Sequence, residues 1–149
     1  MASVNEVAKY IIENCNNVTP KKLQKLAYYV QGWSNALLNR SLIDDTNFEA
    51  WVHGPVSPEL YQTYKKYGWN TINEPAVDVE LNFTSNEEDL LNSVIETYGH
   101  LSGNELEAQT HLETPWINQR IGLDDDEPSN NVISEDDMRT YYWSIYIGD

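Results

Sequence analysis

Apolar residues recur at intervals of three and four along most of the chain, which is the period of an amphipathic helix. The longest such pattern follows Thr19-Pro20, where a helix N-cap residue precedes a proline at the first helical position. It continues to about Asn39 with the apolar series Leu23, Leu26, Ala27, Val30, Trp33 and Leu37. A helix of this size is about 30 Å long. We therefore expect this segment to be the central helix of the fold.

Similar start signals predict further helices on both sides of the central one. Ser3 with Glu6 and Ser102 with Glu105 have the spacing of capping boxes, in which side chain and backbone at the helix start satisfy each other. The remaining predicted helices begin at Ser57, Ser85, Thr114 and Ser134. In each, a cap residue precedes apolar residues at helical spacing.

Residues 41–56 depart from the helical period. Apolar and polar residues alternate over 48–53, which is the pattern of a short strand. The segment 53–58 contains too many glycines and prolines for us to expect helix or strand there. A weaker alternation over 77–83 indicates a second strand that could pair with the first. The predicted fold class is mainly α (α+β), a compact helical domain of about six helices with a small two- or three-stranded β element.

The chain has the length of one domain, and its sequence contains no internal repeat and no convincing interdomain linker. We therefore predict a single domain over residues 1–149. The stretch 122–131 is polar and acidic, and we expect it to be a mobile loop. No apolar run approaches the roughly 20 residues of a membrane span. The N-terminus does not have the pattern of a signal peptide, and a single cysteine allows no intramolecular disulfide. We expect a cytoplasmic protein that does not bind membranes.

Charge is divided unevenly along the chain. The total is −15, and residues 1–70 hold seven basic and six acidic residues, a net of +1. Residues 71–149 hold two basic and 18 acidic residues, a net of −16. Such a surface repels phosphate backbones, so direct nucleic-acid binding is not expected. It suits a basic protein partner or a protein that imitates DNA, and solubility alone explains it equally well.

The sequence offers no arrangement typical of catalysis. His53, His100 and His111 are far apart and lack the spacing of metal-binding motifs, and Cys15 has no surrounding nucleophile motif. There is no phosphate-binding loop and no dinucleotide fingerprint. We therefore expect a protein that is not an enzyme, with no catalytic residues, no metal and no cofactor.

Aromatic residues offer candidate binding surfaces. Tyr61 and Tyr64 lie three residues apart on one predicted helix, so they share a face, and Trp51 lies within plausible reach. Together with His53 they form one candidate partner-binding face. On the central helix Tyr28 is the aromatic residue expected to be exposed, although core packing is the main alternative for it. The acidic residues Asp124, Asp125 and Asp126 are candidates for steering a basic partner.

Other residues are predicted to have structural roles. Gln31, on a helix crowded by large side chains, is expected to be buried and to bond a loop backbone as a clamp. His111 is expected to be a hydrogen-bonded histidine. The further residues assigned to the structural motif are Trp33, Gly54, Pro55, Val56 and Trp116.

Four blocks of sequence carry a resemblance to a known family. They are the run 22–33 (KLQKLAYYVQGW), the run 48–61 (FEAWVHGPVSPELY), the run 64–68 (YKKYG), and a later block with Leu101-Ser102-Gly103, Leu106, Thr110-His111 and Pro115-Trp116. In this order, and spread over about residues 4–145, they resemble the Panacea domain, the SocA-like antitoxin family. The main departure is His53, where the family more often has an aromatic residue before Gly-Pro-Val.

The resemblance implies a mostly helical domain with a small β element. Members of the family resemble the neutralising half of toxin–antitoxin pairs in bacteria and phages. The implied function is an antitoxin that binds a cognate protein toxin directly. Two alternatives stay open: a phage-encoded acidic DNA mimic that inhibits a host nuclease or defence factor, and an adaptor that delivers a toxin to an AAA+ protease.

Overall fold

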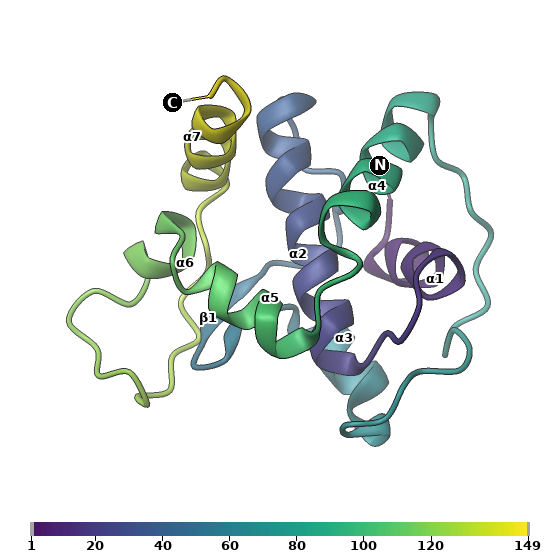
Figure 1. Cartoon of the computed structure of the whole chain (residues 1–149), viewed down its shortest axis with the longest axis horizontal. Helices are drawn as coiled ribbons and strands as arrows, with labels where there is room; N and C mark the ends of the chain where they lie inside the picture. The colour runs from purple at the N-terminus through teal and green to yellow at the C-terminus, as the bar shows by residue number, and fades with distance from the viewer. Residues whose placement is uncertain (1, 149) are drawn as a thin grey trace.

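The computed structural model describes residues 2–148, and the helix α2 (Pro20–Leu37) runs through the middle of them (Figure 1). Other helices pack around α2 on several sides, above all α7 and then α4, α5 and α1. As a result 13 of its 18 residues are buried, polar ones included. A helix buried in this way needs partners for its polar side chains.

The predicted fold class is confirmed, since 53% of the described residues are helical and the sheet has two strands. The other helices are α1 (Val4–Asn14), α3 (Pro58–Tyr64), the 3-10 helix η1 (Lys65–Tyr67), α4 (Ser85–Tyr98), α5 (Gly103–Thr110), α6 (Thr114–Asn118) and α7 (Glu135–Tyr146). The predicted caps hold at the starts of α1, α2, α3, α5 and α7. For α4 the cap is Thr84 and not Ser85, because the Thr84 hydroxyl accepts the N–H of Glu87. For α6 the predicted cap Thr114 is wrong as well, since Thr114 is the first helical residue and the N-cap position is Glu113, which makes no side-chain capping bond.

The sheet is an antiparallel hairpin of β1 (Glu49–Trp51) and β2 (Gly54–Val56). The expectation that 53–58 could not form a strand is therefore wrong. Pro55 is tolerated because it faces Ala50, whose N–H points away from β2 and donates to the Asn131 carbonyl at 2.9 Å. The ladder between β1 and β2 therefore needs no backbone N–H donor at Pro55.

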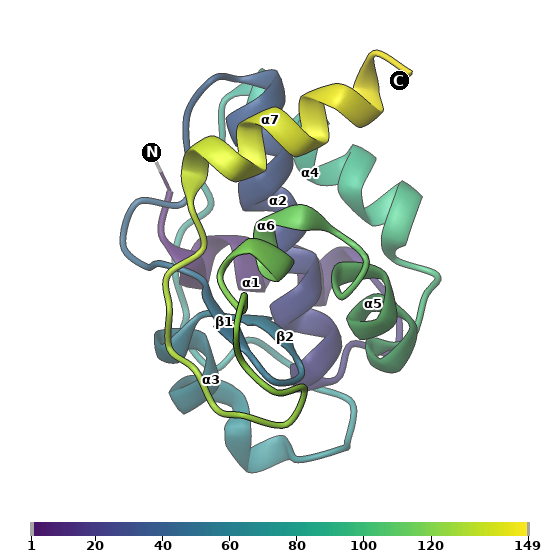
Figure 2. The same cartoon turned by 90° about the vertical axis from the view of Figure 1, so that its left-hand side faces the viewer.

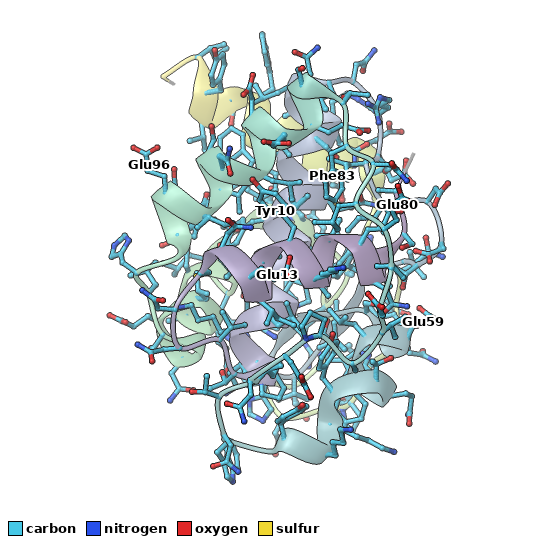
Figure 3. All side chains as sticks on the ribbon, turned by 90° about the vertical axis from the view of Figure 1, so that its right-hand side faces the viewer. Tyr10, Glu13, Glu59, Glu80, Phe83 and Glu96 are labelled. Carbon is cyan, nitrogen blue, oxygen red and sulfur yellow. The ribbon has the colours of Figure 1, made fainter. Side chains whose placement is uncertain are left out.

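The predicted strand over 77–83 is also wrong. This segment packs along α1 at a distance from the hairpin, where side chains hold it in place of a ladder. Lys9 Nζ donates to the Val79 carbonyl at 2.6 Å, and the rings of Tyr10 and Phe83 meet edge to face at 5.6 Å (Figure 3). The rest of this face carries exposed carboxylates, among them Glu13, Glu80 and Glu96 (Figure 3).

Two buried glutamines of α2 hold the loops that lead to and from the hairpin. Gln31 donates to the Ile43 carbonyl at 3.0 Å and accepts the Ile43 N–H at 2.9 Å, which confirms its predicted role as a clamp. Gln24, two helical turns earlier, makes the same pair of bonds to Ser57, at 3.0 and 2.8 Å. These bonds fix the hairpin and the start of α3 against the central helix.

Tyr28 is 1% exposed, so the expectation that it is the exposed tyrosine of α2 is wrong. The reason is α7, which packs on this side of α2: the Tyr142 hydroxyl lies within hydrogen-bond distance of the Tyr28 hydroxyl, at 3.0 Å. The ring of Phe48 closes the same space, 5.7 Å from the Tyr28 ring. Tyr28 therefore belongs to the core.

A buried carboxylate, Glu113, joins α7 to the rest of this core. It accepts the hydroxyls of Tyr142 and Tyr29 at 2.7 and 3.1 Å and the Gln109 amide at 3.1 Å. Burial raises the pKa of Glu113, because the charged form loses its hydration. Tyr29 also stacks on Tyr98 at 4.0 Å.

Candidate partner-binding groove

A groove of about 290 Å³ opens at the end of the molecule where α2 begins, toward the bottom of Figures 1 and 2. The first turns of α2 form one wall, the hairpin a second, and α3 with η1 a third. We call it the aromatic groove, because Trp51, Tyr61, Tyr64 and Trp69 line it together with Lys65 and residues of α2.

The exposed part of the groove is built from three aromatic residues on three segments. The ring of Trp51, from β1, lies 5.2 Å from the ring of Tyr61 on α3. Tyr61 is 42% exposed, and Trp69 is 89% exposed in the loop after η1. This confirms that Trp51 and Tyr61 lie together, as the spacing predicted. Sequence reasoning missed Trp69, for which the available signal was a tryptophan directly after the helix stop at Gly68.

Tyr64 does not belong to the exposed set, and the expectation that it shares an open face with Tyr61 is wrong. It is 2% exposed and lies with Leu60, four residues earlier, on the side of α3 that faces the core. Its hydroxyl accepts the N–H of Ala76 at 3.0 Å, because the segment after η1 folds back over it. Tyr64 thus forms part of the groove floor.

Lys25 forms another part of the floor and is 2% exposed. Its Nζ donates to the Pro55 carbonyl at 3.3 Å. The pKa of Lys25 is lowered to about 7, mainly by burial; Glu107 opposes this change and Lys21 contributes to it. Gly54, with a φ of +106°, lies directly over the lysine, where a Cβ would come within 2.7 Å of Lys25 Cε. The lysine thus ties α2 to the backbone of β2.

His53, at the turn of the hairpin, is mostly exposed and lies at the rim of the groove. Its Nδ1 is 3.1 Å from Glu107 of α5, and the same carboxylate binds Lys21 Nζ at 2.7 Å. This chain of contacts joins the hairpin, α5 and the first turn of α2. Nδ1 of His53 is therefore engaged by Glu107, and only the exposed remainder of the ring can contact a partner.

Two residues predicted to be structural, Trp116 and His111, hold the hairpin from behind together with Arg120. Trp116 Nε1 donates to the Trp51 carbonyl at 2.9 Å, and His111 stacks on the Trp116 ring at 4.0 Å. The expectation that His111 is a hydrogen-bonded histidine is wrong, because within residues 2–148 its Nε2 is buried without a hydrogen-bond partner and ring stacking holds it in place. Burial lowers the pKa of His111, which favours the neutral ring. Arg120, which the sequence did not mark, donates to the Ala50 carbonyl at 2.9 Å. Trp33 packs further along α2, where its Nε1 donates to Tyr98 at 3.0 Å.

The acidic residues Asp124, Asp125 and Asp126 are exposed but lie outside the groove. Their loop runs beside the outer edge of the hairpin (Figure 2), and Arg120 holds it there through the Asp124 and Glu127 carbonyls. A second, wider hollow of about 600 Å³ lies between this loop and the hairpin, with Trp51 as a shared wall. The structure therefore places the acidic loop next to the groove and not in it.

Within residues 2–148 no three histidine, cysteine or acidic side chains come together in a way that could hold a metal ion. None of the helices in this range has the length and apolar character to cross a bilayer. What the groove offers chemically is a set of aromatic surfaces and hydrogen-bond donors, which suits side chains of another protein.

A comparison with protein families matches residues 23–117 to the family described as "Antitoxin SocA-like, Panacea domain". The chain belongs to this family. The match covers the Panacea domain from Leu23 of α2 to Ile117 of α6, and so includes the hairpin, α3, η1 and Trp69. Most of the aromatic groove thus lies in the family region, whereas α7 lies outside it. No curated protein and no solved structure matches the chain.

Proposed function

We propose that this protein is an antitoxin that neutralises a cognate toxin by binding it directly through the aromatic groove. Membership of the SocA-like antitoxin family supports the general role. The observation that carries the binding site is the cluster of Trp51, Tyr61 and Trp69, which leaves two large aromatic side chains widely open to solvent. Exposed aromatic residues around a depression are typical of protein-binding sites.

The size of the groove fits a side chain of a protein partner. At about 290 Å³ it lies at the lower limit of small-molecule pockets, which are roughly 300–1,000 Å³. A partner would insert one or two large side chains between Tyr61 and Trp69. The clamps at Gln24 and Ser57 keep the walls in place before binding, so little ordering is needed.

The net charge of −15 adds long-range attraction for a basic toxin. Asp124, Asp125 and Asp126 stand exposed beside the hairpin and would act during the approach of the partner rather than in the final contact. Neutralisation would then occur by covering the toxin surface in the cytoplasm. Delivery of the bound toxin to an AAA+ protease would use the same contact as its first step.

The proposal is tested by expressing the product of the gene that adjoins this one in a bacterial host, with and without this protein. We expect the adjoining product to stop growth and the antitoxin to restore it. The Tyr61→Ala/Trp69→Ala variant should restore growth poorly at equal protein level. The matched control is Trp143→Ala/Tyr146→Ala, an exposed tryptophan–tyrosine pair on α7.

Two results would contradict this proposal. One is an adjoining product that is harmless, or that stays toxic in the presence of this protein. The other is full rescue by the groove variant together with loss of rescue in the α7 variant, which would move the binding surface to the other end of the molecule (Figure 2).

A further inference from the structure

Most of the basic side chains of this acidic protein already have a hydrogen-bond or ion-pair partner within the chain. Seven of the nine lysines and arginines make a hydrogen bond or an ion pair within residues 2–148. Some bind carboxylates, as Arg40 does with Glu87 at 2.9 Å, and others bind backbone carbonyls, as Lys22 does with Gly99 at 2.6 Å. Over the described chain, only Lys65 and Lys66 lack such a contact.

Both free lysines lie in η1, at the aromatic groove. Lys65 is exposed and lines the groove directly, and Lys66 follows it, with its ammonium 5.6 Å from the ring of Tyr67. None of the 14 residues that line the groove is acidic, and the nearby carboxylate of Glu107 is already bound by Lys21 and His53. In a chain with 24 acidic and nine basic residues, this is a local reversal of sign.

The other polar groups at the open side of the groove are hydrogen-bond donors without partners. Within residues 2–148, neither the Tyr61 hydroxyl nor the Trp69 indole N–H makes a hydrogen bond, although both residues are exposed. Gln24, in contrast, has both amide atoms occupied by Ser57. Besides the exposed ring of His53, the free groups of the lining residues are therefore the Lys65 ammonium, the Trp69 indole N–H and the Tyr61 hydroxyl. Each of these three can donate to an acceptor with negative charge.

We propose that the segment of the toxin that fills the aromatic groove carries an apolar side chain and, within a few positions of it in either direction, an aspartate or glutamate whose carboxylate binds Lys65. This rests on the proposed function and adds the chemistry of the occupant. A polyanion such as nucleic acid is disfavoured, because the total charge of −15 repels it while only two free lysines attract it. A single carboxylate on an otherwise neutral or basic protein meets the local charge without that cost.

The test uses a phage-displayed library of random 12-residue peptides, selected on the wild-type protein. The enrichment of each selected peptide is then compared between the wild-type protein and the Tyr61→Ala/Trp69→Ala variant, and peptides enriched only on the wild type are called groove-dependent. We expect groove-dependent peptides that combine a large apolar residue with Asp or Glu within about three positions. Fluorescence polarisation of the leading peptides should then show binding at least about threefold weaker to Lys65→Gln/Lys66→Gln, since exposed charge pairs contribute modestly.

The matched control is Lys9→Gln/Arg139→Gln, which removes the same charge at two positions outside the groove whose acidic partners are exposed. It should leave peptide binding unchanged. Because Lys9 also donates to the Val79 carbonyl, circular dichroism is used to check that this variant is folded. The inference is overturned if the groove-dependent peptides are rich in Lys or Arg, if their acidic residues can be replaced by Asn or Gln without loss, or if no selected peptide depends on the groove. It is also overturned if ultracentrifugation shows a dimer that the groove variant abolishes, since a second copy would then be the occupant.

These failures differ from failure of the proposed function. Loss of growth rescue in the groove variant, combined with peptides that show no acidic preference, would keep the antitoxin groove and reject only its acidic occupant. Full rescue by the groove variant would reject the groove itself, whatever the peptides show.

Discussion

Gly54 lies against the buried side chain of Lys25, with no room between them for a Cβ atom. The glycine has a φ of +106°, a conformation that residues with a side chain rarely adopt. The Lys25 ammonium donates to the backbone carbonyl of the next residue, Pro55. This contact fixes the turn of the hairpin that presents Trp51 and His53. The stability of the hairpin wall of the groove therefore depends on the contact between Gly54 and Lys25.

Gly54→Ala should destabilise the protein by about 3 kcal/mol, because strained backbone and overlap with Lys25 add together. Gly68→Ala is the matched control: its φ is also positive, at +57°, but no atom lies within 4 Å of the added Cβ. The control should cost about 2 kcal/mol, for the backbone conformation alone, because a ψ of −115° places Gly68 outside the left-handed helical region. Urea denaturation of both variants checks this, and equal losses would show that the contact with Lys25 has no effect.

Lys25→Met should be most favourable at low pH. The folded protein has a Lys25 pKa of about 7 against 10.5 for an ordinary lysine, so below pH 7 the parent bears the full cost of a buried charge. As the pH rises from 7 toward 10.5, the folded state loses this proton before the unfolded state does, and the cost disappears. The stability advantage of the variant should therefore fall by about 4 kcal/mol between pH 6 and pH 10.

This difference is measured by chemical denaturation of parent and variant at several pH values, so that the titration of other groups cancels. A variant whose advantage stays constant over the range would contradict the assignment of a buried, easily deprotonated lysine.

Glu113→Gln should respond to pH in the opposite direction. Burial raises the pKa of Glu113 above its ordinary 4.5, so the folded parent keeps this proton to higher pH than the unfolded chain does. The parent therefore loses stability as the pH rises above about 4.5, and the glutamine variant does not. We expect the stability of the variant relative to the parent to improve between pH 4 and pH 8.

The control for this prediction is Glu96→Gln on the exposed face of α4 (Figure 3), which should change stability by less than about 0.5 kcal/mol at any pH. A Glu113→Gln variant that loses ground as the pH rises would mean that the carboxylate is stabilised in its charged form by the tyrosines around it.

The sequence predicted structure well where the signal is local, as at a helix cap or in a run of apolar residues with helical spacing. Caps such as Ser102 and the long apolar period of α2 were read correctly, and the burial of Gln31 followed from crowding by its neighbours. Tyr28 was misjudged because its burial depends on α7, more than 100 residues later in the chain. Periodicity within one helix carries no information on which distant helix covers it.

The candidate site shows the same limit. The pairing of Trp51 with Tyr61 was expected from the short distance along the chain, but Tyr64 is buried by the loop at Ala76, whose path no local pattern indicated. The sequence does not distinguish Lys65 from the other basic residues, because it does not show which lysines and arginines have a partner in the folded protein. Trp69 was overlooked because it belongs to no periodic element.

Neutralising the acidic loop should affect the rate of association with the toxin more than the stability of the complex. In Asp124→Asn/Asp125→Asn/Asp126→Asn, we expect slower association with a flatter dependence on salt and nearly unchanged dissociation, because these residues lie beside the groove and not in it. Surface plasmon resonance at several salt concentrations separates the two rates. A large increase in the dissociation rate would place the loop in the interface and favour charge mimicry.

The central claim is that the aromatic groove holds the toxin, and the most direct measurement is the affinity of purified toxin for Tyr61→Ala and Trp69→Ala. Circular dichroism should show that each variant is folded, and isothermal titration calorimetry should show that each binds the toxin more weakly by about 2 kcal/mol or more, as expected for aromatic anchors. Trp143→Ala and Tyr146→Ala, on the exposed pair of α7, should bind as the parent does. Parent-like affinity in both groove variants would contradict the account.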